Sequence, residues 1–143
     1  MREILFRGKR IDNGEWVEGA FLNDRDGAFY ICPAVSDISY GDGENRRRIG
    51  CWYKVDPSTV GQYTGLKDKN GKRIWERDIV KTDKFSEPNK QYIIKYDLQF
   101  GAFIGQDRYN CYFVTFDGDS DEFEVIGNIH DNPELLEDFN KEV

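Results

Sequence analysis

The sequence predicts a mainly β protein: an N-terminal antiparallel β meander, a C-terminal SH3-like small barrel, and one short C-terminal helix. Aromatic residues make up 15% of the 143 residues and glycine occurs 14 times. Large flat side chains and frequent turns suit sheets better than helices. Short apolar runs alternate with turn sequences, and two of these turns contain Asn-Gly, which favours tight hairpins because both residues tolerate positive φ.

The first three runs predict the meander. Residues 4–9 form a short extended run, the Asn13-Gly14 turn follows, and residues 15–22 form the second strand. Bulky side chains alternate onto both faces of this second strand, so we expect both of its faces to be covered. A polar turn then leads to a third strand at residues 28–32.

The middle of the chain is less regular. Residues 33–48 contain glycines and a basic triplet, and we expect a mobile loop there. Residues 49–55 return to a strand pattern, which Pro57 ends. A length of 143 residues allows one domain or two small subdomains. We therefore expect an N-terminal β subdomain at residues 1–57 and a barrel with its terminal helix at residues 58–143.

The second half contains five short strand-like runs joined by tight turns, as in a small SH3-like barrel. The first turn again contains Asn-Gly, at Asn70-Gly71. The five expected strands are residues 59–65, 73–81, 91–97, 109–116 and 123–129.

The C-terminus has the pattern of a short helix. Asn132 is a plausible N-cap, and Pro133 suits the first helical position. Leu135, Leu136 and Phe139 then form one apolar face at helical spacing. We expect this helix to dock on the barrel.

Composition excludes several classes of function. The net charge of −7 aids solubility and disfavours wrapping of nucleic acid over a large surface. No apolar run reaches the length of a membrane span, and the start lacks the apolar centre of a signal peptide, so we expect a cytoplasmic protein. The cysteines Cys32, Cys51 and Cys111 form no Cys-x-x-Cys pair, which favours small core thiols in a reducing compartment.

Three motifs resemble metal or catalytic sites, and a structural interpretation is favoured for each. His130 is the one histidine, and its place at a helix start indicates a cap or surface role. Asp117, Asp119 and Asp121 have the spacing of a calcium loop, but the required glycine and glutamate are missing, so a polar hairpin turn is favoured. The glycines at 65 and 71 have the wrong spacing for a phosphate loop. We expect no cofactor, no metal and no catalytic residue identifiable from the sequence.

Basic residues form two clusters that are candidates for contact with nucleic acid or a partner. Basic groups next to aromatic residues bind nucleic-acid strands by phosphate contact and stacking, whereas the structural alternative is a solvated loop or pairing with acidic groups of another subunit. The candidates are Arg46, Arg47, Arg48, Lys67, Lys69, Lys72 and Arg73.

Three stretches, residues 6–19, 55–80 and 125–136, together resemble the YopX-like family of phage and prophage proteins. The resemblance implies an SH3-like C-terminal half and provides no catalytic residue. One position departs from the family pattern, because Arg77 stands where the family usually has glycine between Glu76 and Asp78. If that glycine serves a positive-φ turn, Arg77 is strained there or adopts another geometry.

We therefore hypothesise a non-enzymatic module that binds a protein partner or copies of itself. Nucleic-acid binding through residues 46–48 and 67–73 is the first alternative. The second is an enzyme whose scattered carboxylates meet in a cleft, although the sequence cannot place such a site.

Overall fold

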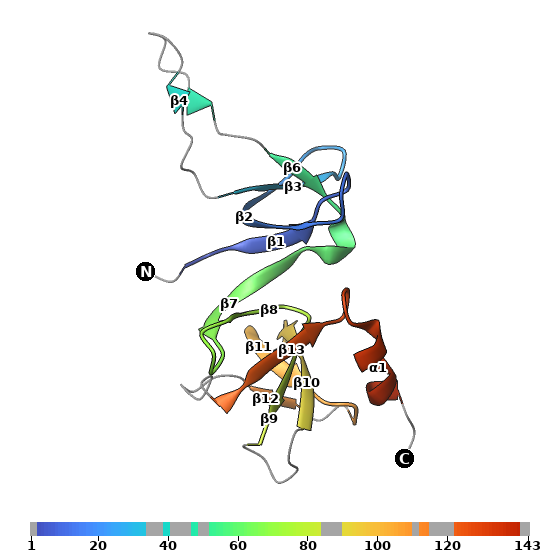
Figure 1. Ribbon diagram of the computed structural model, residues 1–143. Helices are drawn as coiled ribbons and strands as arrows, with labels where there is room; N and C mark the ends of the chain where they lie inside the picture. The colour runs from blue at the N-terminus through green and yellow to red at the C-terminus, as the bar shows by residue number, and fades with distance from the viewer. Residues whose placement is uncertain are drawn as a thin grey trace. The chain divides into compact units, whose positions relative to one another are not determined.

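Antiparallel strands make up most of the described chain in this computed structural model, and the described part has one short α-helix, near its C-terminal end (Figure 1). This confirms the predicted mainly β class. The chain divides into two compact units, Met1–Gln62 and Tyr63–Val143. The structure describes residues 3–33, 39–40, 47–48, 52–83, 90–109, 112–114 and 122–140.

The first unit is built from an antiparallel meander. Neighbouring strands pair in the order β1, β2, β3 and β6, and Asn13-Gly14 lies in the first hairpin as predicted. The start of β7 pairs with the other side of β1. The bounds are β1 Phe6–Lys9, β2 Trp16–Asn23, β3 Phe29–Cys32, β6 Tyr53–Val55 and β7 Gly61–Lys67.

The last strand of this meander returns to the end of the first. Arg10 forms a bridge with Val55, the Ile11 N–H donates to the Lys54 carbonyl (3.0 Å), and the Asp56 N–H donates to the Lys9 carbonyl (2.8 Å). Val55 is fully buried as a result. The approach is close, since a Cβ at Gly8 would lie 3.0 Å from the Val55 side chain.

The expectation that both faces of β2 are covered was wrong. Glu18, Ala20 and Leu22 are exposed, whereas the alternate positions face the core side. There Phe21 packs between two other rings, with centroid distances of 5.4 Å to Phe6 and 5.0 Å to Phe29. One face of a strand in a small sheet suffices to form a core, and the other meets solvent.

The expected loop at residues 33–48 contains a short ladder in which Ser39 pairs with Arg48 and Tyr40 with Arg47. These are strands β4 (Ser39–Tyr40) and β5 (Arg47–Arg48). The expected strand at residues 49–55 begins at Tyr53 within the described residues, and residues 49–51 lie outside them.

A 3-10 turn, η1 (Pro57–Thr59), precedes β7. The Asp56 carboxylate accepts the Ser58 N–H at 3.0 Å and caps this turn. The Thr59 hydroxyl accepts the Lys9 N–H at 2.8 Å, which ties the turn to β1. The proline that predicted a break therefore lies in a turn that is anchored to the first strand.

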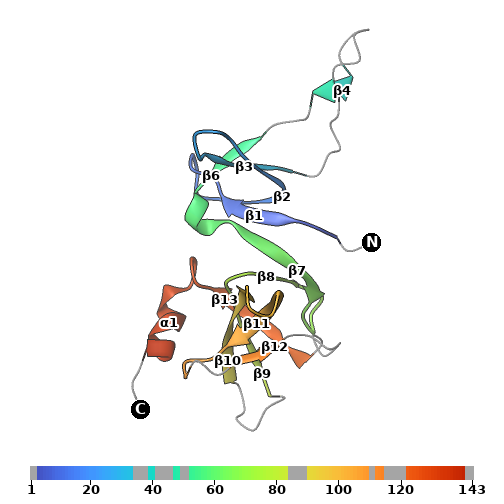
Figure 2. The same ribbon diagram turned by 180° about the vertical axis from the view of Figure 1, so that it is seen from behind.

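The second unit contains a five-stranded antiparallel sheet in the order β12-β11-β10-β9-β13, and Figure 2 shows part of it from behind. Strand β8 pairs with the later part of β7. The core of this unit contains Ile74, Val80, Tyr92, Ile94 and Phe123. The bounds are β8 Arg73–Trp75, β9 Asp78–Thr82, β10 Lys90–Asp97, β11 Ala102–Gln106, β12 Tyr112–Val114 and β13 Glu124–Asn128.

Two expected strands of this unit need correction. The run at residues 73–81 is two strands, β8 and β9, separated by a turn in which Arg77 has a φ of 67°. The expected strand at residues 109–116 does not include Tyr109, which lies in a turn; its described part is β12, and residues 110–111 and 115–116 lie outside the described residues. Strand β11 was not predicted.

The predicted C-terminal helix is present as α1 (Pro133–Asn140). Asn132 was expected to cap the start of the helix with its side chain. Its Oδ1 instead accepts the Asn128 N–H at 3.2 Å. It therefore joins the helix start to the end of β13. In the part of the chain that the structure describes, no helix is long and apolar enough to cross a membrane.

Candidate interaction surfaces

The hairpin between β10 and β11 carries a group of exposed apolar side chains. Tyr96 is 45% exposed, Leu98 90% and Phe100 44%. We call these three residues the hairpin tip surface. Single exposed apolar residues are common on soluble proteins, but these three lie within five residues of one hairpin, and apolar side chains that gather on a surface mark contacts with partners.

The backbone of this hairpin holds its tip in a defined shape. One carboxylate oxygen of Asp97 accepts the N–H groups of Gln99 (2.8 Å) and Phe100 (3.1 Å). The Gly101 N–H donates to the Asp97 carbonyl at 2.9 Å, and Gly101 has a φ of 61°, which suits glycine. A tip fixed by three hydrogen bonds presents its side chains without a large ordering cost on binding.

The base of the hairpin is also packed. The rings of Tyr96 and Phe103 meet edge to face, with centroids 5.2 Å apart. Lys95 donates to Gln106 across the same two strands at 2.6 Å. The tip is thus an apolar projection on a supported hairpin.

The predicted basic cluster at residues 67–73 surrounds the Asn70-Gly71 turn between β7 and β8. At the centre of this turn is the carboxylate of Asp68, which is 5% exposed. One of its oxygens accepts the N–H groups of Asn70 and Lys72, each at 2.9 Å. The basic side chains therefore surround a buried carboxylate, which reduces the positive potential of the turn.

Two of the four cations of this turn contact other groups. Lys69 lies 3.2 Å from Glu124, which also lies 3.4 Å from Lys81. The hydrogen bond from Lys69, aided by the charges of both lysines, lowers the pKa of the Glu124 carboxyl. Arg73 lies over the Tyr63 ring, 5.5 Å from its centroid. Lys67 and Lys72 are exposed.

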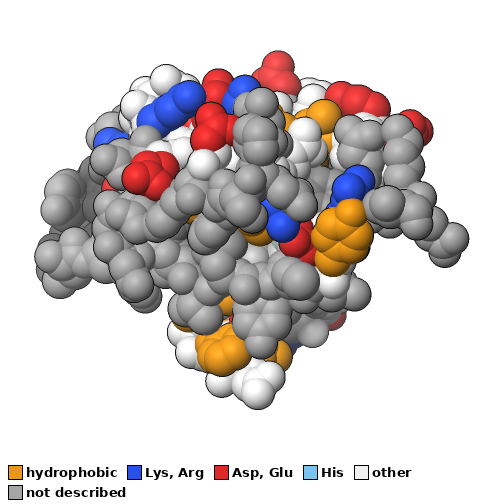
Figure 3. Space-filling view, turned by 90° about the horizontal axis from the view of Figure 1, so that it is seen from below, with side chains coloured by type: hydrophobic (Ala, Val, Ile, Leu, Met, Phe, Trp, Pro, Cys, Tyr) orange, Lys and Arg blue, Asp and Glu red, His pale blue; other side chains and the backbone are white. Residues whose placement is uncertain are grey.

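Of the other predicted cluster, Arg46 lies outside the described residues. Arg47 and Arg48 form β5, of which only the backbone is described. Figure 3 shows one face of the molecule, on which acidic and basic side chains of the described residues are mixed and hydrophobic ones lie in separate places. The described residues do not gather into one large basic surface on that face.

A basic and aromatic group on β1 and β2 was missed from the sequence. Arg7 lies over the Trp16 ring at 4.5 Å from its centroid, and Lys9 lies 5.4 Å from the same ring. Lys9 is paired with Trp16 in the ladder, and Arg7 is two positions from Lys9 on the same face. The sequence did carry a signal for this group: Arg7 and Lys9 alternate just before the first hairpin, and Trp16 follows that hairpin.

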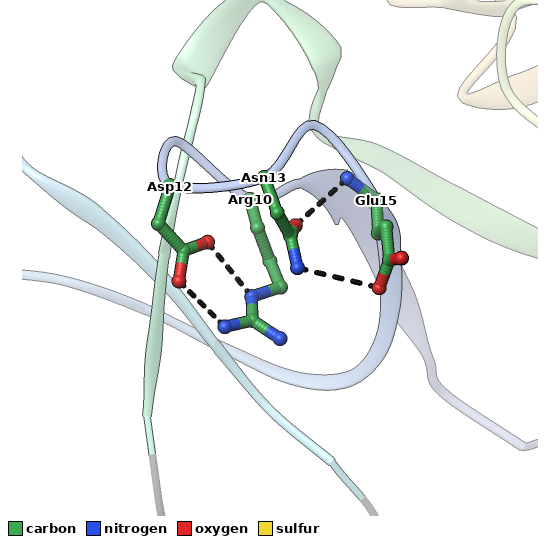
Figure 4. Close-up of polar contacts among 4 residues, drawn as sticks. All are labelled: Arg10, Asp12, Asn13 and Glu15. Atoms are coloured by element: carbon green, nitrogen blue, oxygen red, sulfur yellow. Dashed lines mark hydrogen bonds and ion pairs between the residues drawn. The ribbon is translucent and has the colours of Figure 1, made fainter.

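The turn between these strands contains a second arginine stack. Arg10 donates two hydrogen bonds to Asp12, at 2.9 and 2.6 Å (Figure 4), and its guanidinium lies 4.1 Å from the centroid of the Tyr53 ring. The hydrogen bond raises the pKa of Arg10 and lowers that of Asp12. This arginine stabilises the turn and offers little unpaired charge to a ligand.

The described residues give little support to a metal or carboxylate site. Among them, no group of three or more His, Cys, Asp or Glu side chains could hold a metal ion. The acidic turn at Asp117, Asp119 and Asp121 lies outside the described residues. The nearly buried carboxylate of Asp107 lies 3.0 Å from the ammonium group of Lys90. It also accepts the Tyr109 N–H at 2.9 Å, so it supports the turn after β11.

The comparisons with known proteins agree with this fold. A family model described as YopX protein matches residues 5–137. The crystal structure of protein EF1440 from Enterococcus faecalis has a TM-score of 0.62 and 28% identity, covering 95% of this chain and 99% of that one. The crystal structure of protein yopX from Bacillus subtilis has a TM-score of 0.50 and 19% identity, covering 100% of this chain and 99% of that one. No curated protein matches the chain.

Proposed function

This chain belongs to the YopX family, and from that premise we propose that it acts as a non-enzymatic binding module that associates with copies of itself through the hairpin tip surface. The observation that carries the proposal is the 90% exposure of Leu98 on a tip whose backbone is fixed by Asp97. Aromatic side chains such as those of Tyr96 and Phe100 are common anchors of protein interfaces, and Leu98 adds exposed apolar area on the same hairpin.

The proposal also rests on the contacts that the charged side chains make within the chain. The cations Lys69, Arg73 and Arg10 each contact a carboxylate or an aromatic ring of the chain itself. Leu98 of the hairpin tip surface, by contrast, leaves 90% of its surface exposed to water. Removal of its surface from water therefore supplies a driving force that the compensated charges do not.

Light scattering coupled to size exclusion tests self-association over a series of protein concentrations. The measured mass of the natural chain should rise with concentration, and Leu98→Ser should remain a monomer. Leu22→Ser is the matched control, because Leu22 is also an exposed leucine (47%) but lies in the first unit. It should associate like the natural chain. A monomer mass at every concentration for the natural chain would contradict the proposal.

Nucleic-acid binding remains the second candidate, and the group around Trp16 favours it. Residues 1–62 contain 9 basic and 10 acidic residues, whereas residues 63–143 contain 11 and 17, so the acidic surplus lies in the second unit. The first unit therefore repels phosphates less. Two cations next to one indole match the mixed stacking and phosphate contact of single-strand binding.

Retention of a labelled single-stranded oligonucleotide at low salt tests this second candidate. Arg7→Ala with Lys9→Ala should abolish retention, and Lys54→Ala, which changes an exposed lysine of the same unit, should not. Binding should weaken as salt rises. Variants at Arg46, Arg47 and Arg48 test the predicted loop in the same assay. No retention by the natural chain rules this candidate out.

We further propose that β9 to β13 form a small SH3-like barrel. The first four of these strands pair in sequence order, and β13 returns to pair with β9. That order of strands supports the SH3-like description. The resemblance of the sequence to phage and prophage proteins supports a role in a phage programme, inside the cell.

A further inference from the structure

The chain contains two Asn-Gly turns that differ in how their asparagine side chains are held. Both asparagines and both glycines are exposed. Gly14 and Gly71 have similar φ values of 71° and 78°, and their backbone N–H groups both donate to a carbonyl, of Arg10 (2.9 Å) and Asp68 (3.0 Å). The two glycines therefore have similar φ values and bonded N–H groups, although the bond of Gly14 spans four residues and that of Gly71 three.

The amide of Asn13 is hydrogen-bonded at both ends. Its Oδ1 accepts the Glu15 N–H at 2.9 Å, and its Nδ2 donates to the Glu15 carboxylate at 3.3 Å (Figure 4). These bonds restrict rotation of the side chain. The carboxamide of Asn70 makes no hydrogen bond with the described part of the chain; the bond at that residue is made by its backbone N–H, which donates to Asp68.

We propose that Asn70 is a site of spontaneous deamidation, and that it converts several-fold faster than Asn13 in the folded protein. The backbone nitrogen of Gly71 attacks the Asn70 Cγ and forms a five-membered succinimide ring. The bond from Cγ to the side-chain nitrogen breaks, and ammonia leaves with the proton from the backbone nitrogen. Water then opens the ring at either carbonyl, which leaves aspartate or isoaspartate at this position.

The charged residues beside the two turns also differ, although the Asp68 carboxylate at Asn70-Gly71 and the Arg10 guanidinium at Asn13-Gly14 reduce this difference. The attack requires the glycine nitrogen to lose its proton, and nearby cations favour the anion that forms. Lys69 and Lys72 flank Asn70-Gly71, whereas Asp12 and Glu15 flank Asn13-Gly14. A side chain on the glycine would hinder the attack, and both sites lack one.

Conversion would change the turn around Asp68. Aspartate at position 70 adds a negative charge beside Lys69 and Lys72. Isoaspartate also lengthens the backbone by one carbon between Asn70 and Gly71. The Asn70 and Lys72 N–H groups both donate to one Asp68 oxygen, so a longer backbone cannot keep both bonds. The isoaspartate form should therefore unfold more easily than the Asn70→Asp variant, which alters charge alone.

Peptide mapping by mass spectrometry tests the proposal during incubation at neutral to mildly alkaline pH. The Asn70 peptide should gain the mass of an amide-to-acid conversion, largely as isoaspartate, several-fold faster than the Asn13 peptide. Incubation in denaturant should reduce the difference between the two deamidation rates, because unfolding breaks the hydrogen bonds of the Asn13 side chain to Glu15. Glu15→Ala, which removes one of those bonds, should raise the Asn13 rate in the folded chain.

Two results would overturn the assignment. One is an Asn13 rate equal to or greater than the Asn70 rate in the folded protein. The other is a folded-state rate at Asn70 as low as that of Asn70→Gln, a variant whose longer side chain disfavours the five-membered ring. Folding of each variant is checked by circular dichroism before incubation.

Discussion

The Asp68 carboxylate accepts a hydrogen bond from the backbone N–H of Val125, with 3.0 Å between nitrogen and Oδ2. The other carboxylate oxygen holds the turn between β7 and β8. The Lys69 N–H adds a bond to the Phe123 carbonyl at 2.9 Å. One buried carboxylate thus shapes a turn and joins it to β13, which explains how the basic turn keeps its form.

Asp68→Ala should lower the free energy of unfolding by about 2–4 kcal/mol, because three backbone N–H groups lose the side chain that accepts their hydrogen bonds. Chemical denaturation measures this loss. Asp26→Ala is the control, since Asp26 is exposed in another turn, and should change stability by less than about 0.5 kcal/mol. A loss at Asp68 no larger than the control would show that water replaces the carboxylate without cost.

Arg77→Gly should raise the free energy of unfolding by about 0.5–1 kcal/mol, because a φ of 67° costs a residue with a Cβ more than it costs glycine. Arg77→Ala keeps the Cβ and removes the rest of the side chain, so it should not stabilise the protein. Thermal unfolding of the three chains compares them. If glycine and alanine have equal effects, the backbone at this turn is not strained.

The stability of the second unit should fall on acidification, in part through Glu124. Its hydrogen bond from Lys69 lowers its pKa below the ordinary value of 4.5. A lowered folded-state pKa stabilises the folded chain above pH 4.5, and this contribution disappears as pH falls through the folded value. Glu124→Gln should therefore be less stable than the natural chain at neutral pH and equal to it in strong acid.

Urea unfolding at several pH values measures that difference. Glu137→Gln serves as the control, since Glu137 is an exposed residue of α1, and its difference from the natural chain should not change with pH in this way. A Glu124→Gln difference that is the same at every pH would contradict the assignment of the effect to this carboxyl.

Gly19→Ala should weaken the first unit strongly. A Cβ at Gly19 would lie 1.8 Å from the Cys32 carbonyl oxygen, a backbone atom that cannot rotate away. Overpacking of this kind costs about 1–3 kcal/mol or more. Ala20→Ser, at the exposed next position, should be nearly neutral in the same denaturation experiment. A stable Gly19→Ala chain would show that β2 and β3 can separate at little cost.

Much of the fold could be predicted because its turns are marked in the sequence. Asn13-Gly14, Asn70-Gly71 and Pro133 each lie at a predicted boundary. The turn at Arg77 was not placed as a break between strands, because an arginine occupies a left-handed position where glycine is the common signal. The start of β11 was missed for a related reason, since Gly101 was not recognised as the end of a hairpin.

The candidate surfaces were harder to predict. Lysines at positions 67 to 73 suggested an open basic turn, but the contact of Lys69 with Glu124 joins residues that are far apart in the chain. The exposure of Leu98 could not be predicted either. An apolar residue is expected to be buried unless it is known to lie in an exposed turn. The group of Arg7, Lys9 and Trp16 required the register of β1 against β2.

The pairing of β9 with β13 has a consequence for synthesis of the protein. Strands β9 and β10 leave the ribosome consecutively and can form a hairpin early, but the other edge of β9 has no partner until β13 has been made. Until then Ile79 and Val80 lack their neighbours from β13. An unfinished chain therefore exposes a strand edge that can pair wrongly, and the second unit can complete its sheet only after β13 has been made.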